Sequence, residues 1–109
     1  AHYKLDNLTV IVDWNGLQID GTIDEVMSLG DLHAKFEAFG FTVREVDGHD
    51  LEDIMDALTR KCEADKPLCV LAHTVKGKGI SFYENQRGSH GAVPNDEQYV
   101  RAMAELEVL

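Results

Sequence analysis

Along this chain, the spacing of apolar residues is that of a β-strand in some segments and that of a helix in the segments between them. Residues 8–12 form a β-branched run that is typical of a strand covered on both faces. Residues 41–46 alternate and predict a second strand, and the apolar-rich residues 68–73 predict a third. Polar residues and glycines at 13–16 and 47–50 indicate loops where the first two strands end.

Helical spacing predicts a helix between the first two strands. Leu32, Phe36 and Phe39 recur at that spacing. Asp31 is a suitable N-cap, and Gly40 is typical of the residue that follows a helix. We therefore expect a short helix that begins after Asp31 and ends before Gly40.

Two more helices are predicted, one on each side of the last strand and the glycine-rich segment 76–94 that follows it. Asp50 is the expected N-cap of the first, which ends near Pro67. Asn95 and Gln98 match a capping box for the second. The apolar residues on one side of these helices are Leu51, Ile54, Met55, Leu58 and Cys62 in the first and Val100, Met103 and Leu106 in the second.

The order of these elements predicts the fold class. Strands that alternate with helices are typical of a parallel sheet with right-handed crossovers, so we expect an α/β fold with a mainly parallel sheet. Ligands of such sheets bind at the carboxyl ends of the strands. Residues 13–16 and the segment after Thr74 both follow such ends, which makes them candidates for a functional site.

Composition narrows the class of partner. A formal net charge of −10 argues against a nucleic-acid surface, where lysine and arginine neutralise phosphates. No apolar stretch approaches the ~20 residues that span a bilayer, and no signal peptide is visible. We expect a cytoplasmic protein in which Cys62 and Cys69 are small buried hydrophobes. The chain starts at Ala1 without a methionine, so Ala1 is either a true start or a truncation or cleavage point, and the sequence leaves both open.

Asn15 and Gly16 follow the first predicted strand. The asparagine could present its side-chain oxygen outward, and the glycine would let the chain turn so that a backbone carbonyl one residue later faces the same point. Two neutral oxygens suit a hard divalent cation that also keeps phosphate oxygens, as Mg²⁺ does. The alternative is a simple turn, which is the usual meaning of Asn-Gly. The residues alone leave both open.

A family resemblance adds to this pattern. Residues 4–21, KLDNLTVIVDWNGLQIDG, resemble the second half of the thiamine-diphosphate motif of transketolases, which begins with Gly-Asp-Gly and ends at an asparagine. The similarity continues through FEAFG (36–40), VDGHD (46–50), KP (66–67), TVKGKG (74–79) and SHGA (89–92). The chain most resembles the N-terminal subunit of bacterial transketolases that are split into two polypeptides. This implies the three-layer α/β thiamine-diphosphate-binding fold, with residues 1–109 as the C-terminal part of that domain.

The resemblance implies roles for particular residues. Asn15 would bind Mg²⁺ (or Ca²⁺) through its side chain, and Leu17 through its backbone carbonyl. Ile19 would pack against the rings of the cofactor. His90 would reach the diphosphate and the substrate side of the thiazolium ring, as a cofactor-binding and catalytic residue.

The implied activity is thiamine-diphosphate-dependent transfer of a two-carbon ketol unit from a ketose phosphate to an aldose phosphate, as in the pentose phosphate pathway. The Gly-Asp-Gly triplet and the activating glutamate of the pyrimidine-binding domain are missing from this sequence. The chain would therefore need the rest of its domain and a pyrimidine-domain subunit, in an oligomer, and would be inactive alone.

Two alternatives stay open. One is another thiamine-diphosphate enzyme, such as deoxyxylulose-phosphate synthase, dihydroxyacetone synthase or a two-oxoacid dehydrogenase subunit. The other is a non-catalytic structural fragment that needs a partner chain. The sequence assigns no role to Trp14, His33 or His73, although many relatives carry an acidic residue at the position of Trp14.

Overall fold

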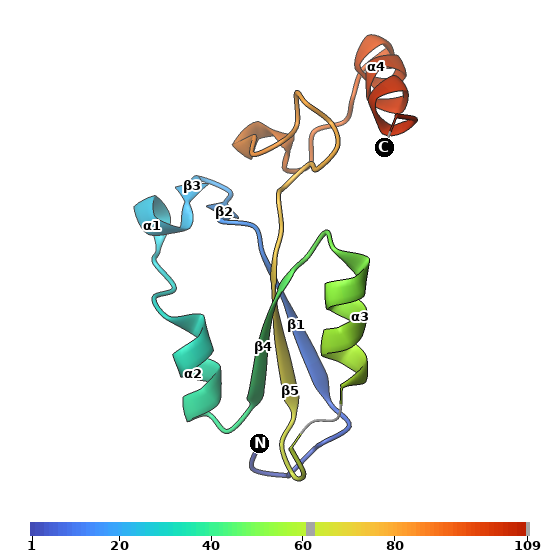
Figure 1. Ribbon diagram of the computed structural model, residues 1–109. Coiled ribbons are helices and arrows are strands. Elements are labelled where there is room, and N and C mark those ends of the chain that lie inside the picture. Colours follow the sequence, from blue (N-terminus) through green and yellow to red (C-terminus); the bar gives the residue numbers. More distant parts are fainter. Residues whose placement is uncertain (61–62, 109) are drawn as a thin grey trace. The chain divides into compact units, whose positions relative to one another are not determined.

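The structure, a computed structural model, describes residues 1–60 and 63–108. The chain forms two compact units, and the elements of each are labelled in Figure 1. The first unit contains Ala1–Asn15 and Leu29–Thr74, and the second contains Gly16–Ser28 and the chain from Val75 onward. The first unit holds the parallel sheet.

Three parallel strands form this sheet, in the order β1 (Thr9–Trp14), β5 (Leu68–His73) and β4 (Thr42–Asp47). The central strand β5 has the bounds predicted for it, and all its residues except His73 are buried. The strands end in register, because Trp14 and Asp47 both pair with His73. The predicted α/β class and parallel sheet are therefore confirmed.

Strand β1 differs from its prediction. It extends to Trp14, so Asp13 and Trp14 belong to the strand and not to the loop after it. It is also not covered on both faces, since exposed and half-buried residues alternate along it and Ile11 is 61% exposed. The physical reason is that the helices of this unit pack mainly on β4, which leaves one face of β1 open.

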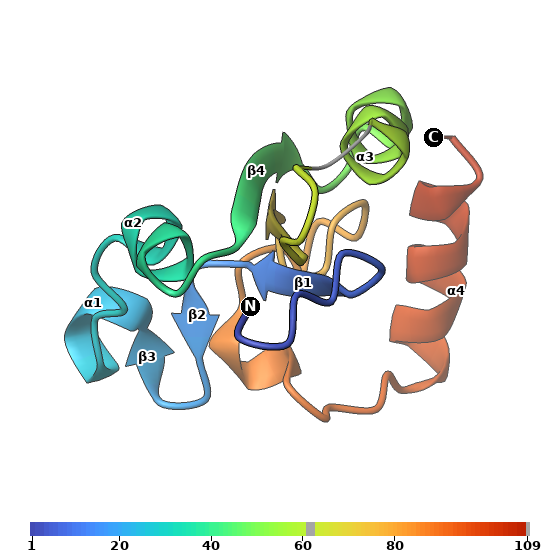
Figure 2. The same ribbon diagram turned by 90° about the horizontal axis from the view of Figure 1, so that it is seen from below.

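Two helices cover opposite faces of the sheet, α2 (Leu32–Ala38) and α3 (Leu51–Thr59), and so create three layers (Figures 1 and 2). Their predicted N-caps are confirmed, but α3 ends at Thr59, well before the predicted end near Pro67. The Asp31 carboxylate accepts a hydrogen bond from the backbone N–H of Ala34 at 2.8 Å. The Asp50 carboxylate accepts from the backbone N–H of Glu52 at 2.9 Å and from that of Asp53 at 3.3 Å.

The core lies between the sheet and α3. Its buried members are Val46, Ala57, Leu68, Val70 and Ala72, with Ile54 packed against them. The predicted apolar stripe of α3 is only partly buried, because Leu51 is 77% and Met55 57% exposed. Cys69 is a buried free thiol in β5, whereas Cys62 lies outside the described residues.

The second unit contains a small hairpin and the last helix. Strands β2 (Leu17–Gln18) and β3 (Gly21–Thr22) pair antiparallel and lead into the short helix α1 (Ile23–Val26), none of which was predicted. A 3-10 turn, η1 (Arg87–Ser89), and helix α4 (Asp96–Leu106) follow after β5.

The predicted capping box of α4 is confirmed. The Asn95 side chain accepts from the Gln98 N–H at 2.8 Å, and the Gln98 side chain accepts from the Asn95 N–H at 3.0 Å. The apolar side predicted for α4 is largely exposed, with Val100 at 67%, and the buried residue of this helix is Ala102. None of the helices within residues 1–60 and 63–108 combines the length and apolarity that a membrane crossing requires.

Candidate functional site at the carboxyl ends of the strands

The carboxyl ends of β1 and β5 are joined by one backbone and one side-chain hydrogen bond. The Thr74 N–H donates to the Trp14 carbonyl at 3.4 Å, and the Thr74 hydroxyl donates to the Asp13 carboxylate. Asn15 follows immediately and is half-buried. It therefore leaves the sheet at the edge where parallel sheets bind their ligands, as the sequence predicted.

Gly48 brings the loop after β4 close to the same edge. Its N–H donates to the His73 carbonyl at 2.8 Å. A Cβ at this position would lie 2.4 Å from the Thr74 side-chain methyl, so no larger residue fits without movement. The glycine of the Asp-Gly-His-Asp sequence is thus required by close packing, since its backbone is not among those with a positive φ.

The hairpin of the second unit carries two of the predicted cofactor residues. Gly16 adopts a φ of 75°, and its carbonyl accepts from the Ile23 N–H at 3.0 Å, which closes the hairpin. Leu17 is half-buried in β2. Ile19 lies in the turn between β2 and β3 and is 70% exposed. An apolar side chain at the tip of a turn is available to pack against a ligand.

His90 caps the C-terminal end of η1. Its N–H donates to the Arg87 carbonyl at 3.2 Å, and the residue is exposed. The Arg87 guanidinium donates at 2.9 Å to the carbonyl of Asp20, the neighbour of Ile19. Arg87 therefore ties the loop that carries His90 to the hairpin that carries Ile19, a link that the sequence did not predict.

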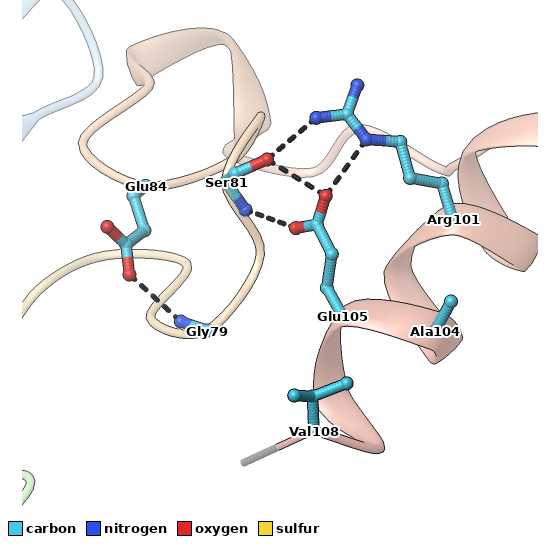
Figure 3. Close-up of a pocket in the computed structure, with 7 residues that line it drawn as sticks. All are labelled: Gly79, Ser81, Glu84, Arg101, Ala104, Glu105 and Val108. Atoms are coloured by element: carbon cyan, nitrogen blue, oxygen red, sulfur yellow. Dashed lines mark hydrogen bonds and ion pairs between the residues drawn. The ribbon is translucent and has the colours of Figure 1, made fainter.

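A shallow pocket of about 590 Å³ lies between the glycine-rich segment and α4, within the second unit (Figure 3). The Glu105 carboxylate accepts from the Ser81 N–H at 2.6 Å and from its hydroxyl at 2.9 Å. These hydrogen bonds, with a smaller contribution from Arg101, lower the pKa of Glu105. The pocket is lined by Gly79, Ser81, Glu84, Arg101, Ala104, Glu105 and Val108. None of the predicted site residues is among them. The Ser81–Glu105 hydrogen bonds fasten α4 to the glycine-rich segment.

A second polar cluster lies on the sheet of the first unit and was missed from the sequence. Glu45 lies between two histidines: its Oε1 is 2.8 Å from His33 Nδ1, and its Oε2 is 2.8 Å from His73 Nε2. The ring of His73 stacks on Trp14, with centroids 4.7 Å apart and planes 29° apart. These residues come from four separate elements, so no local spacing could have indicated their contact.

The protonation states of this cluster follow from its contacts. Hydrogen bonds from His73 and His33 lower the pKa of Glu45. The hydrogen bond to Glu45 raises the pKa of His33, and Glu37, 3.4 Å from His33 Nε2, adds to this effect. Across residues 1–60 and 63–108, no group of three or more His, Cys, Asp or Glu side chains is arranged to hold a metal ion.

The four predicted site residues are divided between the two units. Asn15 ends the first stretch of the first unit, whereas Leu17, Ile19 and His90 belong to the second. The Arg87 bond brings the segments of Ile19 and His90 together within the second unit. Asn15 and Leu17 are separated by a single residue in the sequence.

Comparison with known proteins identifies the family. A family model described as the thiamine diphosphate-binding domain of transketolase matches residues 1–106. An apulose-4-phosphate transketolase subunit from Phocaeicola vulgatus is 44% identical over 105 residues, which cover 95% of this chain and 37% of that protein. The 6-deoxy-6-sulfo-D-fructose transketolase subunit SqwG of a Clostridium species is 40% identical over 105 residues, or 95% of this chain and 38% of that protein. The chain therefore spans little more than a third of the length of these relatives.

Solved structures agree with this match. The transketolase of Campylobacter jejuni superimposes with a TM-score of 0.88 at 33% identity, over 97% of this chain and 17% of that one. A transketolase variant from Pichia stipitis superimposes with a TM-score of 0.86 at 26% identity, over 97% of this chain and 16% of that one. The parallel sheet and the matched sequence lead to the same conclusion: this chain belongs to the transketolase family and matches its thiamine diphosphate-binding domain.

Proposed function

We propose that this chain is part of a transketolase that uses thiamine diphosphate and Mg²⁺ to transfer a two-carbon ketol unit from a ketose phosphate to an aldose phosphate. The observation that carries the proposal is the family match over residues 1–106, together with the place of Asn15 directly after β1. The relatives and solved structures described above are all transketolases, which favours this activity over that of other thiamine-diphosphate enzymes.

In this proposal the Asn15 side-chain oxygen and the Leu17 backbone carbonyl bind the metal ion. Both are neutral oxygen ligands, which suit a hard cation that also keeps diphosphate oxygens and a carboxylate from elsewhere in the protein. Asn15 is half-buried at the carboxyl end of the sheet, and Gly16 supplies the left-handed turn between the two ligands. The donor set fits Mg²⁺, and Ca²⁺ could occupy the same ligands.

When bound, thiamine diphosphate would supply carbanion and electron-sink chemistry. The chain's own residues would bind and orient. The exposed Ile19 side chain would pack against the cofactor rings and exclude water from them. The His90 imidazole, between Gly88 and Gly91, would donate a hydrogen bond to a diphosphate oxygen and hold or release a proton beside the substrate.

The partners belong to the same proposal. Several relatives are named as single subunits of a transketolase, which supports a second polypeptide that contributes the pyrimidine-binding domain. The Gly-Asp-Gly triplet is missing from this sequence, so the remainder of the cofactor domain would supply the anionic metal ligand. The substrates in the relatives' names are a sugar phosphate and a related sugar sulfonate, and we propose sugar phosphates for this chain.

The metal-ligand assignment is tested with Asn15→Ala in the complete enzyme. We expect the dissociation constant for thiamine diphosphate at fixed Mg²⁺ to rise by about tenfold or more, since even residues that only support metal ligands change affinity by about 10–100-fold. Isothermal titration calorimetry measures this constant, and stability without cofactor, followed by the thermal midpoint, should fall far less than the affinity does. Asn7→Ala, at an exposed residue, is the matched control. An unchanged dissociation constant for Asn15→Ala would reject the assignment.

His90 is tested by turnover. His90→Ala should lower kcat by roughly 10²–10⁴-fold, the usual contribution of a positioned acid or base, even when the cofactor is saturating. Steady-state kinetics with ketose and aldose phosphates measures the loss, and pyruvate as an alternative donor tests the rival enzyme class. Wild-type turnover would refute the role of His90.

The need for a partner is tested by calorimetry of this chain alone with thiamine diphosphate and Mg²⁺. Heat of cofactor binding in that titration would contradict the proposal that the chain depends on a partner.

A further inference from the structure

The His33–Glu45–His73 cluster forms a continuous line of contacts that ends beside a proposed metal ligand. His33 lies on α2, Glu45 on β4 and His73 on β5. Both oxygens of Glu45 are occupied, each by a separate imidazole at 2.8 Å. Beyond His73 the line continues through a stacked ring contact to Trp14, the last residue of β1. The next residue along the chain is Asn15.

The strand register explains why these side chains meet. Trp14 pairs with His73, while Glu45 pairs with Leu71, two residues before His73. Because side chains alternate across a sheet, Trp14, His73 and Glu45 project from one face. The core with α3 uses the other face, where Val46 and Ala72 are buried. The cluster therefore lies on the face opposite the α3 core, where Glu45 pairs with the buried Leu71.

Side-chain contacts contribute to holding the end of β1. Among the strands of residues 1–60 and 63–108, β1 pairs with β5 only, and its last backbone hydrogen bond, from Thr74 to the Trp14 carbonyl, is 3.4 Å long. A bond of this length is weaker than the usual one of about 2.9–3.0 Å. Two side-chain contacts, the Thr74–Asp13 hydrogen bond and the Trp14–His73 stack, therefore contribute to the direction of the backbone at residue 14.

We propose that Glu45 and His73 are positioning residues, which hold the Trp14 indole and thereby orient Asn15 for its metal ion. This inference rests on the proposed role of Asn15 as a ligand. Glu45 remains ionised over the neutral range because its hydrogen bonds from His73 and His33 lower its pKa, so it is a strong acceptor for both rings. His33 fixes one oxygen of Glu45, which leaves the other directed at His73.

The test uses Glu45→Ala in the complete enzyme, with Glu37→Ala as the matched control. Glu37 also contacts His33, at 3.4 Å from Nε2, but it is not part of the line to Trp14. We expect Glu45→Ala to weaken thiamine diphosphate binding about three- to tenfold while kcat at saturating cofactor stays unchanged. Glu45 acts on Asn15 only through His73 and Trp14, so its loss should cost less than the about 10–100-fold lost with a residue that contacts a metal ligand directly. Glu45→Gln, which keeps one acceptor oxygen, should restore part of the affinity. Glu37→Ala should bind the cofactor as the wild type does.

A second readout does not depend on activity. Trp14 is the sole tryptophan of this chain. The difference between the fluorescence of each protein and that of its Trp14→Phe version isolates the emission of this indole. Without cofactor, Glu45→Ala should make Trp14 more accessible to quenching by acrylamide, whereas Glu37→Ala should not.

The outcomes separate the two proposals. If Asn15→Ala loses the cofactor while Glu45→Ala binds it normally, the positioning role is wrong and the ligand assignment stands. If Glu45→Ala lowers kcat at saturating cofactor without a change in affinity, the positioning role is also wrong. If Asn15→Ala itself binds normally, both proposals fall.

Discussion

Gly77 and Gly91 have the same left-handed backbone conformation but differ in the space available for a side chain. Both are in the left-handed region, with φ values of 73° and 78°. A Cβ on Gly77 would lie 2.6 Å from the Tyr83 carbonyl oxygen, whereas a Cβ on Gly91 would meet nothing within 4 Å. The conformational penalty of alanine is therefore shared by the two positions, and the steric penalty falls on Gly77 alone.

Gly77→Ala should consequently destabilise the protein more than Gly91→Ala. We expect about 1–2 kcal/mol for Gly91→Ala, from the left-handed backbone of a non-glycine residue. Gly77→Ala should cost about 1–3 kcal/mol more, because the Tyr83 backbone must move to admit the methyl group. Urea denaturation measures both free energies of unfolding. Equal losses for the two variants would show that the turn around Tyr83 gives way freely.

Several single residues could be interpreted correctly from the sequence. Asp31, Asp50 and Asn95 cap their helices as predicted, because an N-cap depends on a side chain and backbone amides two or three residues away. His33 and His73 could not be interpreted, because their partner Glu45 is distant from each of them in the sequence. The need for glycine at position 48 could not be predicted either, because it comes from the close approach of Thr74, which is distant in the sequence.

Among the elements, α3 depends on a neighbouring strand for its C-terminal end. The last turn of α3 contains no basic residue. The guanidinium of Arg44, on β4, donates to the carbonyl of Ala57 and, at 3.0 Å, to that of Arg60. These carbonyls are among those that a helix leaves without an intrahelical partner, and a positive charge there also stabilises the helix dipole. Arg44 thus allows strand β4 to stabilise the C-terminal end of α3.

Arg44→Met should loosen α3 without disturbing the caps at its beginning. Loss of charge-assisted hydrogen bonds at the helix end should cost about 1–2 kcal/mol. Hydrogen exchange of the α3 amides, followed by mass spectrometry, should accelerate by roughly 5–30-fold, the factor to which that free energy corresponds. Arg60→Met is the control, because the Arg60 side chain forms an exposed ion pair with Asp56, and such pairs contribute about 0–1 kcal/mol. Similar exchange rates in the two variants would contradict the capping role.

Element boundaries could be predicted where they depend on local signals. The bounds of β5 match the prediction, because a run of buried apolar residues lies between Pro67 and the polar segment after it. β4 is displaced by one residue from the predicted 41–46. The hairpin of β2 and β3 was not predicted, since two-residue strands are too short to show a period.

For the chain as a whole, the exposed apolar residues support the proposal that it works within a larger protein. Ile11, Leu51 and Val100 are 61%, 77% and 67% exposed, although each lies in a predicted strand or on a predicted apolar side. The chain spans 37% of the length of its relative from Phocaeicola vulgatus, which leaves most of that protein to provide further contacts. Burial of apolar side chains of this size against a neighbouring surface lowers the free energy of the protein.

Local signals were sufficient for the caps, the central strand, the glycine-rich segment and the resemblance to transketolases, which the family match confirmed. These features depend on residues that are close together in the chain or on a continuous motif. Three-dimensional folding was needed to show that one face of β1 is open, that Arg44 caps α3 and that Glu45 joins two histidines beside Trp14. The physical reason is that strand register and helix docking bring together residues from distant segments, and no local spacing specifies those contacts.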